Sequence, residues 1–281
     1  MKNLIVGANS FLARSITKQL LDYGQTVEGV FNNNRDQLLP QLNYYQTENL
    51  SELPDDYDYV YILSAYIPKC NENEITSRLF DINVGLTENI VKQFSNAKII
   101  YASSVSIYGN QEKVLDEQSP SLSPNPYGLS KLWGEQIVRL SEQFAIVRIS
   151  SMYGEGMKTD TFIPQIIESA LKRNEISIWG DGSRQQNYIS VDTVAEYMVA
   201  ASQQSTNETY LAVDHKSYSN LEVAKLIQQY SQCELVFFGT DNSISYYYNN
   251  EFSAKNLDIQ SKHPFEQNIE GLIKWIEKMS L

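Results

Sequence analysis

Tyr127 and Lys131 can move a proton together, and their spacing would place both side chains on one face of a helix. They lie in the stretch PNPYGLSKLWGEQIVRL (124–140), where prolines lead into helical periodicity. A phenol has an ordinary pKa of roughly 10, so it needs a neighbouring cation before it acts as a base near neutral pH. The pair therefore predicts an acid/base tyrosine whose pKa is lowered by a lysine ammonium.

Ser104 would complete this arrangement. It follows KIIYAS (98–103), a predicted strand, and a serine at that point can hold a reacting oxygen against the phenol. A single Tyr-x-x-x-Lys pair is more often found on a protein surface than in an active site. The strand end SSVSIYG and the proline-spaced loop before Tyr127 favour the active-site interpretation here.

The first strand and the following turn have features of a dinucleotide-binding site. LIVG (4–7) ends at a glycine, and a helical pattern covers 10–23 with Ser10 as its N-cap. Gly7 would allow a tight turn, and the small Ser10 and Ala13 would let the backbone approach a pyrophosphate at the helix N-terminus. The second and third glycines of the full pattern are absent. An ordinary strand-to-helix turn is therefore the alternative, although the position at the start of alternating strands and helices favours the dinucleotide.

The residues after the second predicted strand (26–31) bear on the choice of cofactor. Asn32, Asn33 and Arg35 stand where a carboxylate would bind the ribose hydroxyls of NAD. Amides and a guanidinium suit a 2′-phosphate better, since a carboxylate would repel it. The stretch favours NADP over NAD, with a solvated Arg35 as the alternative.

The order of the predicted elements indicates an α/β protein. Strand patterns alternate with helix patterns, which predicts right-handed βαβ units and a doubly wound parallel sheet of the Rossmann type. The strands are predicted at 4–7, 26–31, 59–63, 98–103 and 144–149, and the helices at 10–23, 85–94 and 124–140. Ligands bind at the carboxyl edge of such sheets.

The regular alternation of strand and helix patterns ends at about residue 150. Glycines and polar residues then cluster in GDGSRQQN (180–187). We expect residues 1–152 to form the dinucleotide-binding domain, with 188–206 returning to it. Residues 153–187 and 207–281 should form a smaller substrate-binding lobe over the carboxyl edge of the sheet.

Composition excludes several classes of partner. The 281 residues include 22 Lys plus Arg and 34 Asp plus Glu, a net charge of −12 that disfavours nucleic acid. No apolar run approaches the roughly 18 residues that span a bilayer. The two cysteines, Cys70 and Cys233, are far apart, which favours reduced thiols and a cytoplasmic protein without a membrane partner. The two histidines, His215 and His263, have no metal-ligand spacing, so no metal site is expected.

Together these stretches resemble the extended short-chain dehydrogenases/reductases, the NAD-dependent epimerase/dehydratase family that includes UDP-galactose 4-epimerase and nucleotide-sugar 4-ketoreductases. The resemblance covers nearly the whole chain. Its further stretches are YVYILSAY (59–66), NVGLT at Asn83, Arg148 before SSMYGEG, IWGDGSRQQNYISVDTVA (178–195), SYSNLEVAKLI (217–227) and FEQNIEGLIKWI (265–276).

The resemblance implies a set of site residues. Ser104, Tyr127 and Lys131 would be the catalytic triad. The cofactor would be held by Gly7, Asn9, Ser10, Phe11, Leu12, Asn32, Asn33, Arg35, Asn49, Leu50, Ser64, Ala65, Tyr66, Asn83, Ser103, Tyr127 and Lys131. The substrate would be held by Ser104, Ser106, Ser151, Lys158, Arg184 and Gln186.

The family chemistry is hydride transfer at a sugar carbon, usually C4, of a nucleotide-linked sugar. A 4-ketoreductase and a 4-epimerase remain open. A 4,6-dehydratase is disfavoured, because Val105 and Ser106 replace the Asp-Glu pair that such enzymes carry after the triad serine, and neither can act as acid or base. The alternative from another class is a sensor or scaffold that binds the dinucleotide without turnover.

The residues expected to bind the nucleotide part of the substrate depart from the family pattern. Ser151 replaces the asparagine of Arg-x-x-Asn, and Gln186-Asn187 replaces an Arg-Asp pair whose arginine grips the diphosphate in many members. Arg184 or Lys158 could take over that role, with a solvated loop charge as the alternative for Arg184. The family also implies a homodimer built on the Tyr127 helix and its neighbour.

Overall fold

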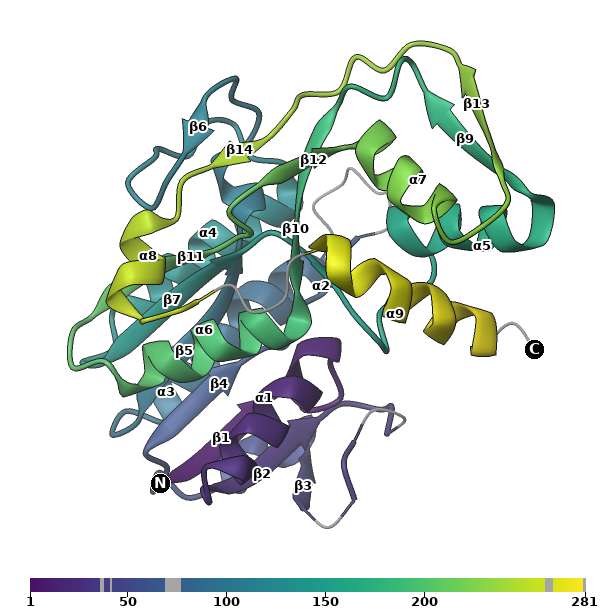
Figure 1. The fold of residues 1–281 in the computed structure, drawn as a ribbon. Coiled ribbons are helices and arrows are strands. Elements are labelled where there is room, and N and C mark those ends of the chain that lie inside the picture. Colours follow the sequence, from purple (N-terminus) through teal and green to yellow (C-terminus); the bar gives the residue numbers. More distant parts are fainter. Residues whose placement is uncertain (36–37, 41, 69–76, 261–264, 280–281) are drawn as a thin grey trace.

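A parallel sheet of seven strands forms the larger part of the computed structural model, which describes residues 1–35, 38–40, 42–68, 77–260 and 265–279 (Figure 1). The strand order is β3-β2-β1-β4-β5-β7-β11, and every neighbouring pair runs parallel. The strands are β1 (Lys2–Val6), β2 (Thr26–Phe31), β3 (Asn43–Gln46), β4 (Tyr59–Ile62), β5 (Lys98–Ser104), β7 (Phe144–Ile149) and β11 (Glu208–Ala212). This order confirms the predicted Rossmann-type fold and places its ligand crevice beyond the carboxyl ends of β1 and β4, where the order reverses.

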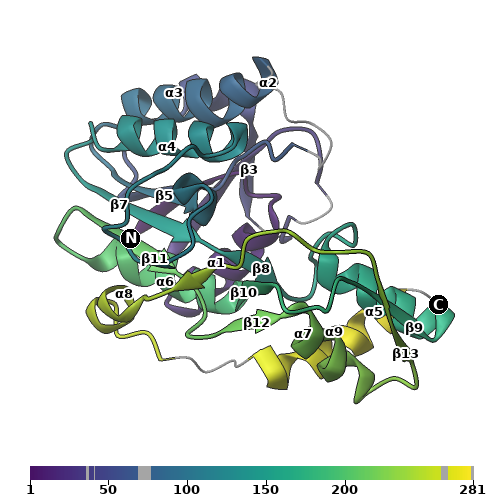
Figure 2. The same cartoon turned by 90° about the horizontal axis from the view of Figure 1, so that it is seen from above.

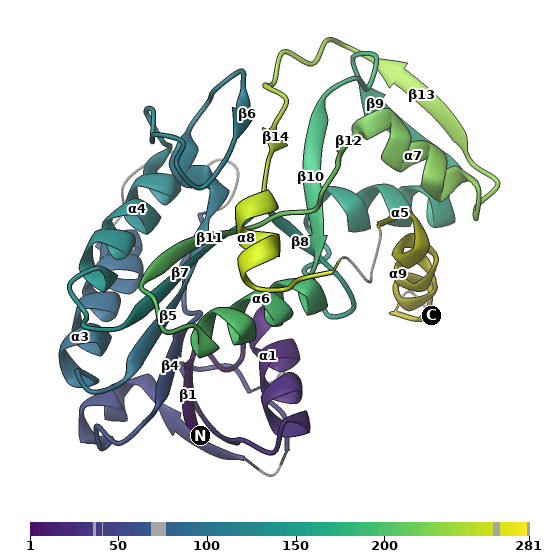
Figure 3. The same ribbon diagram turned by 60° about the vertical axis from the view of Figure 1, so that its left-hand side comes forward.

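Helices cover both faces of the sheet (Figure 3). On one side lie α1 (Phe11–Asp22) and α6 (Val191–Gln203), and on the other α3 (Leu86–Gln93) and α4 (Pro126–Val138). Successive strand residues therefore enter different cores: Ile5 packs with α1 and α6, whereas Leu4 and Val6 pack with Ile90 of α3 and Val138 of α4. Because both faces are covered, the central strands contain continuous apolar runs, such as 4–6 in β1 and 144–147 in β7.

A smaller lobe stands beside the carboxyl edge of the sheet (Figure 2). It contains α5 (Phe162–Arg173), α7 (Asn220–Gln228) and α9 (Phe265–Met279), with β9 (Glu175–Trp179) paired to β13 (Glu234–Phe238). Its core centres on Phe265, whose ring contacts Tyr153, Tyr188 and Tyr218. A three-stranded sheet of β8 (Ser151–Tyr153), β10 (Gln185–Ser190) and β12 (Ser217–Ser219) connects this lobe to the larger unit.

The division of the chain differs from the expected boundaries at β11. That strand lies in the range 207–281, which was assigned to the smaller lobe, yet it pairs with β7 at the edge of the main sheet. The physical reason is burial on both faces, since four of its five residues are buried. Leu257, just after α8 (Glu251–Asn256), also packs in the core of the larger unit.

The remaining elements are short and irregular. They are the 3₁₀ segments Thr47–Glu52 and Val105–Tyr108, α2 (Ser77–Phe80), the π-helical turn Asp81–Gly85, and the paired strands β6 (Val114–Leu115) and β14 (Tyr247–Tyr248). Within the described ranges, no helix combines the length and apolarity that crossing a bilayer would require.

Candidate active site

The strand β5 and the helix α4 bring Ser104 and Tyr127 together. Ser104 is the last residue of β5, and Tyr127 is the second residue of α4, next to the N-terminal Pro126. Asn125 caps the helix by accepting a hydrogen bond from Gly128 N at 2.7 Å. The Ser104 side chain acts on the Tyr127 phenol and lowers its pKa, so the two side chains lie close together. Two of the three triad residues predicted from sequence therefore meet directly.

Gly128 allows this meeting because α4 packs against the backbone of the segment after Ser104. A Cβ atom at position 128 would come within 2.2 Å of the Ser106 carbonyl oxygen. Any larger residue would therefore push the start of α4 away from the end of β5. The glycine in Tyr-Gly-Leu-Ser-Lys is thus a packing requirement for the contact between the phenol and the serine.

Lys131 lies one turn along α4 and is 1% exposed. Its Nζ is 4.0 Å from the ring centroid of Tyr101, a fully buried residue of β5, so the ammonium rests on an aromatic face. Burial lowers the pKa of Lys131 to about 7, and the charge of Glu135 opposes that shift. Tyr127 is also electrostatically coupled to Tyr101, so both α4 side chains face the same strand residue.

Without a bound ligand, the phenol of Tyr127 keeps its proton at neutral pH. Burial raises the pKa of this phenol to about 12, and the Ser104 side chain acts in the opposite direction. At neutral pH the phenol is therefore protonated and acts as a donor. A further positive charge beside it would favour the phenolate and turn the same group into a base. The arrangement suits an acid/base whose pKa is set by a bound cation.

Beneath Lys131 lies a buried ion pair that the sequence did not predict. Glu135 of α4 is 0% exposed and binds Arg148 of β7 through both carboxylate oxygens, at 3.0 and 2.9 Å. Ser103 Oγ donates to the same carboxylate at 2.6 Å. The hydroxyl of Ser103, a residue expected at the cofactor, thus links the sheet to α4. The available signal was a glutamate four residues after Lys131, combined with an arginine inside an otherwise apolar strand.

Asn83 is buried in the π-helical turn and holds the segment after β4. Its Oδ1 accepts from Tyr66 N at 2.7 Å, and its Nδ2 donates to Tyr66 O and to Ser130 Oγ, both at 2.9 Å. These bonds use both donors of the amide, and they connect Tyr66 to the residue that precedes Lys131. The structure thus places Asn83 behind the expected cofactor surface.

The turn between β1 and α1 lies against the residues that follow β4. Gly7 has a φ of +91°, and a Cβ atom there would come within 2.6 Å of Ser64 N. Ser10 caps α1 by accepting from Ala13 N at 3.3 Å. Ser64 Oγ is buried and has no hydrogen-bond partner among the described residues. A bare backbone turn, a helix N-terminus and a free hydroxyl meet here, which fits the phosphates and ribose of a dinucleotide.

Other expected cofactor residues are more scattered. Leu12 and Leu50 are buried members of the two sheet cores, and Phe11 packs between the core under α1 and that of the smaller lobe. Asn32 and Arg35 are exposed after β2, and the Arg35 guanidinium lies 5.0 Å from the Phe31 ring centroid. The last group is described by exposure alone: Asn9, Asn49 and Tyr66 are half-buried, and Asn33 and Ala65 are exposed.

A cavity of about 280 Å³ begins beside the triad. Ser104 Oγ donates to Ser106 Oγ at 3.1 Å, and Ser106 forms part of the cavity wall. The wall consists of Val105, Ser106, Gly109, Asn110, Ser123, Asn125, Ser150, Ser151, Gln186, Asn187, Tyr246 and Tyr248. Three of the expected substrate residues, Ser106, Ser151 and Gln186, thus share one cavity.

The other three expected substrate residues lie outside that wall: Ser104, which bonds the wall residue Ser106, and Lys158 and Arg184. Lys158 is exposed and Arg184 is half-buried. The positive charge of Arg184 acts to lower the pKa of Tyr188 and of Asp241. No cluster of metal-ligating side chains is found within the described part of the chain, and His263 and Cys70 lie outside it.

Comparisons with known proteins identify the family and agree with the fold. A family model described as the NAD dependent epimerase/dehydratase family matches residues 3–212. An uncharacterized UDP-glucose epimerase of Bacillus subtilis is 26% identical over 269 residues, which cover 82% of each chain. The dTDP-4-dehydro-6-deoxy-D-allose reductase of Streptomyces bikiniensis is 25% identical over 258 residues, 80% of this chain and 79% of the relative. The UDP-glucuronic acid 4-epimerase from Bacillus cereus, solved in complex with NAD, has a similar fold, with a TM-score of 0.87 and 19% identity over 100% of both chains.

Proposed function

Since the chain belongs to the NAD-dependent epimerase/dehydratase family, we propose that it transfers a hydride at a carbon, C4, of a nucleotide-linked sugar. It would act as a 4-ketoreductase or a 4-epimerase with Tyr127 as the acid/base. One observation carries the proposal: the neighbouring Tyr127 and Ser104, with Lys131 one turn along the same helix, lie beside a polar cavity at the carboxyl edge of the sheet.

Each triad group has a distinct task in this proposal. The bound dinucleotide supplies the hydride chemistry and a positive nicotinamide ring. Tyr127 holds or releases the proton on the sugar oxygen, and Ser104 donates a hydrogen bond to that oxygen. The Lys131 ammonium favours the phenolate form of Tyr127 and is placed to bond the nicotinamide ribose. The turn at Gly7 and the free hydroxyl of Ser64 support the binding of the dinucleotide.

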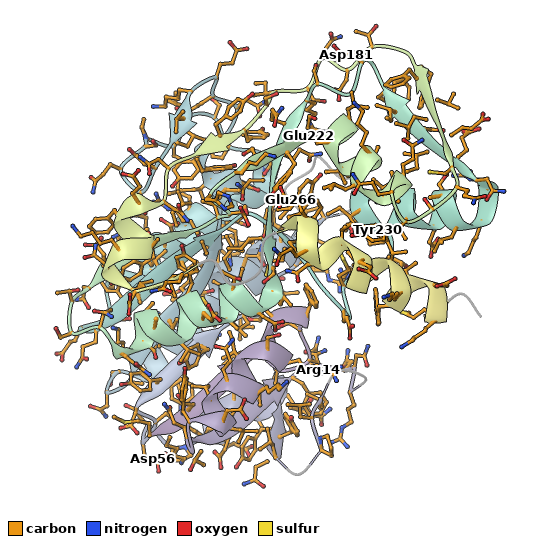
Figure 4. The ribbon with its side chains drawn as sticks, in the orientation of Figure 1. Arg14, Asp56, Asp181, Glu222, Tyr230 and Glu266 are labelled. Carbon is orange, nitrogen blue, oxygen red and sulfur yellow. The ribbon has the colours of Figure 1, made fainter. Side chains whose placement is uncertain are left out.

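The test is the substitution Tyr127→Phe, which removes the proton-carrying atom and little else. We expect turnover to fall about 100- to 10,000-fold with unchanged dinucleotide affinity, the usual range for loss of a general acid/base. Tyr230→Phe is the matched control, because Tyr230 is an exposed tyrosine beyond the end of α7 (Figure 4). Equal turnover of the Tyr127→Phe variant and the unmodified protein would favour a dinucleotide-binding sensor without catalysis.

The reductase and the epimerase differ in their redox balance. A reductase consumes one NADH or NADPH for each keto sugar, whereas an epimerase returns the hydride to the same carbon and shows no net change in cofactor absorbance. Both classes are named among the relatives. The family also includes dehydratases, and we propose that this chain is not one, because Val105 and Ser106 offer no acid or base beside Ser104.

The choice between NAD and NADP is a separate proposal. The family description and the structural neighbour name NAD, and neither supports a preference for NADP. The residues after β2 favour NADP, because Asn32 and Asn33 carry no charge and Arg35 is an exposed cation. Arg35→Ala should then weaken NADPH binding several-fold and leave NADH binding unchanged, with the exposed Lys18→Ala as the control. Equal loss of both cofactors would remove the reason for expecting NADP.

We further propose that the protein works in the cytoplasm as a homodimer. Cys233 is a buried free thiol, as expected in a reducing compartment. The outer face of α4 carries the exposed side chains of Leu129 and Trp133, which would be covered in a dimer.

A further inference from the structure

The cavity beside the triad is polar and uncharged. Its wall is made of serine hydroxyls, asparagine and glutamine amides and tyrosine phenols, apart from Val105 and Gly109, and none of the described residues that line it is a lysine, an arginine or an acid. Hydroxyls and amides can both donate and accept hydrogen bonds, as sugar hydroxyls do. The volume of about 280 Å³ is near the lower limit of small-molecule sites, roughly 300 Å³, which suits a sugar ring better than a whole nucleotide sugar.

Arg148, two residues before the wall residue Ser150, is buried and uses four of its five N–H donors within the protein. Its Nε and one terminal nitrogen bind Glu135, and the other terminal nitrogen donates to the Tyr108 hydroxyl at 3.2 Å and to the Glu117 carbonyl at 2.9 Å. The guanidinium is also neutralised by the buried carboxylate of Glu135. A negatively charged substituent in the cavity therefore gains little from this cation.

Lys216 is similarly occupied on the other side of the wall. Its carbonyl accepts from Asn187 Nδ2 at 3.1 Å, which places its backbone at the cavity. Its ammonium lies 3.2 Å from Glu222 and 3.7 Å from Glu266, at the starts of α7 and α9, where Figure 4 labels both acids. The ammonium is thus directed toward two carboxylates of the smaller lobe.

Asn187 and Asn125 show which bonding groups of the wall are already used. Asn187 accepts from Ser150 Oγ and Asp214 N and donates to two carbonyls, so its amide is engaged on both sides. The Oδ1 of Asn125 caps α4, which leaves its Nδ2 as a neutral donor. A buried acid, Asp214, adjoins the wall through the bond from its backbone N to Asn187 Oδ1, and its negative charge would repel an anion.

We propose that this cavity selects an uncharged, hydroxyl-bearing sugar ring and discriminates against a ring that carries a carboxylate, such as a uronic acid. This inference rests on the proposed function and names the class of sugar within it. A carboxylate moved from water into a cavity without a free cation loses hydration that neutral donors do not fully replace. A hydroxyl or a carbonyl at the same carbon needs only the neutral donors that the wall provides.

The test compares the affinities of two sugars on one carrier. The dinucleotide-loaded protein is titrated by calorimetry with UDP-glucose, UDP-glucuronate and UDP alone, and the series is repeated with the dTDP forms. We expect the glucuronate form to bind at least about tenfold more weakly than the glucose form, which corresponds to about 1.4 kcal/mol. Equal or tighter binding of the glucuronate form overturns the inference.

Ser151→Arg provides the reverse experiment, because Ser151 is an exposed residue of the cavity wall. The added guanidinium should reduce the discrimination to less than threefold or invert it. Ser183→Arg is the matched control, since Ser183 is exposed outside the wall, and it should leave the ratio unchanged. An equal change in both variants would mean that general surface charge sets the ratio, which overturns the inference.

The two levels of the account fail in different ways. Nucleotides that bind without discrimination between the sugars overturn the inference alone and leave the proposed hydride transfer standing. Absence of binding by both UDP and dTDP forms overturns the proposed nucleotide carrier, and with it the inference that depends on it.

Discussion

Tyr127 and Lys131 respond to the same burial with opposite shifts of pKa. Burial raises the pKa of the phenol to about 12 and lowers that of the ammonium to about 7. Above pH 7 both shifts favour neutral side chains, so the pair carries little charge in the protein alone. A positively charged ligand beside the phenol would therefore have a large effect on where the proton resides.

Lys131→Met separates the catalytic role of the ammonium from its cost to stability. We expect at least about a 100-fold loss of turnover, because the phenolate loses its cation. Since the pKa of Lys131 is lowered in the folded state, the unfolded chain binds more protons between about pH 7 and the ordinary lysine pKa, and the stability of the unmodified protein rises with pH across that window. The variant should therefore melt at a higher temperature, by at least about 2 °C at pH 6 and less at pH 10.

The control for this prediction is Lys113→Met, because Lys113 is an exposed lysine whose replacement removes the same charge. The quantity to compare is the melting temperature of Lys131→Met minus that of the unmodified protein. A smaller value at pH 6 than at pH 10 would show that the buried ammonium stabilises the fold, which contradicts the prediction.

At the scale of elements, the buried ion pair of Glu135 and Arg148 contributes to holding α4 on the sheet. Glu135→Gln keeps the shape of the side chain but leaves the Arg148 guanidinium without its carboxylate. Removing one partner of a buried ion pair costs about 3–5 kcal/mol, and we expect a loss of this size in the free energy of unfolding measured with urea. Glu142→Gln, at an exposed position, should change it by less than about 0.5 kcal/mol. Similar stability of the two variants would show that the pair does not hold α4.

Local patterns predicted the elements that carry the triad. The strand ending at Ser104, the helix around Tyr127 and the Gly7 turn follow from periodicity, prolines and a glycine, all of which act over a few residues. β11 was assigned to the smaller lobe because nothing local reveals which sheet a short apolar strand will join. The Glu135–Arg148 pair also depends on two elements meeting in space, which spacing along the chain does not show.

The candidate site was predictable to a similar extent. Ser106, Ser151 and Gln186 share a cavity wall, whereas Leu12 and Leu50 are buried in the cores and Ser103 and Asn83 make internal hydrogen bonds. The ligand contacts expected of all these residues stay predictions. A resemblance identifies positions near a ligand, whereas the direction of each side chain depends on the packing around it. Tyr246 and Tyr248 were missed as wall residues, since this segment reaches the cavity through long-range contacts, the pairing of β14 with β6 and the bond from Tyr246 N to Gln185 O.

At the scale of the whole molecule, the outer face of α4 predicts the assembly. Trp133 is 52% exposed and contacts Phe80 of α2 edge-on, with their ring centroids 5.5 Å apart. We expect light scattering to give the mass of a dimer, and Trp133→Glu to give a monomer because a buried charge would oppose the contact. Trp179→Glu is the matched control, since Trp179 is 57% exposed in the smaller lobe. A monomer in the unmodified protein would rule out this interface.

Transfer of a labelled hydride tests the central claim most directly. The protein is supplied with a 4-keto nucleotide sugar and NADH or NADPH deuterated at the transferred position of the nicotinamide, and the product sugar is examined by mass spectrometry. The account predicts one deuterium at the sugar carbon, and none formed at a comparable rate by Tyr127→Phe. A product without deuterium, or equal labelling by the Tyr127→Phe variant, would contradict it.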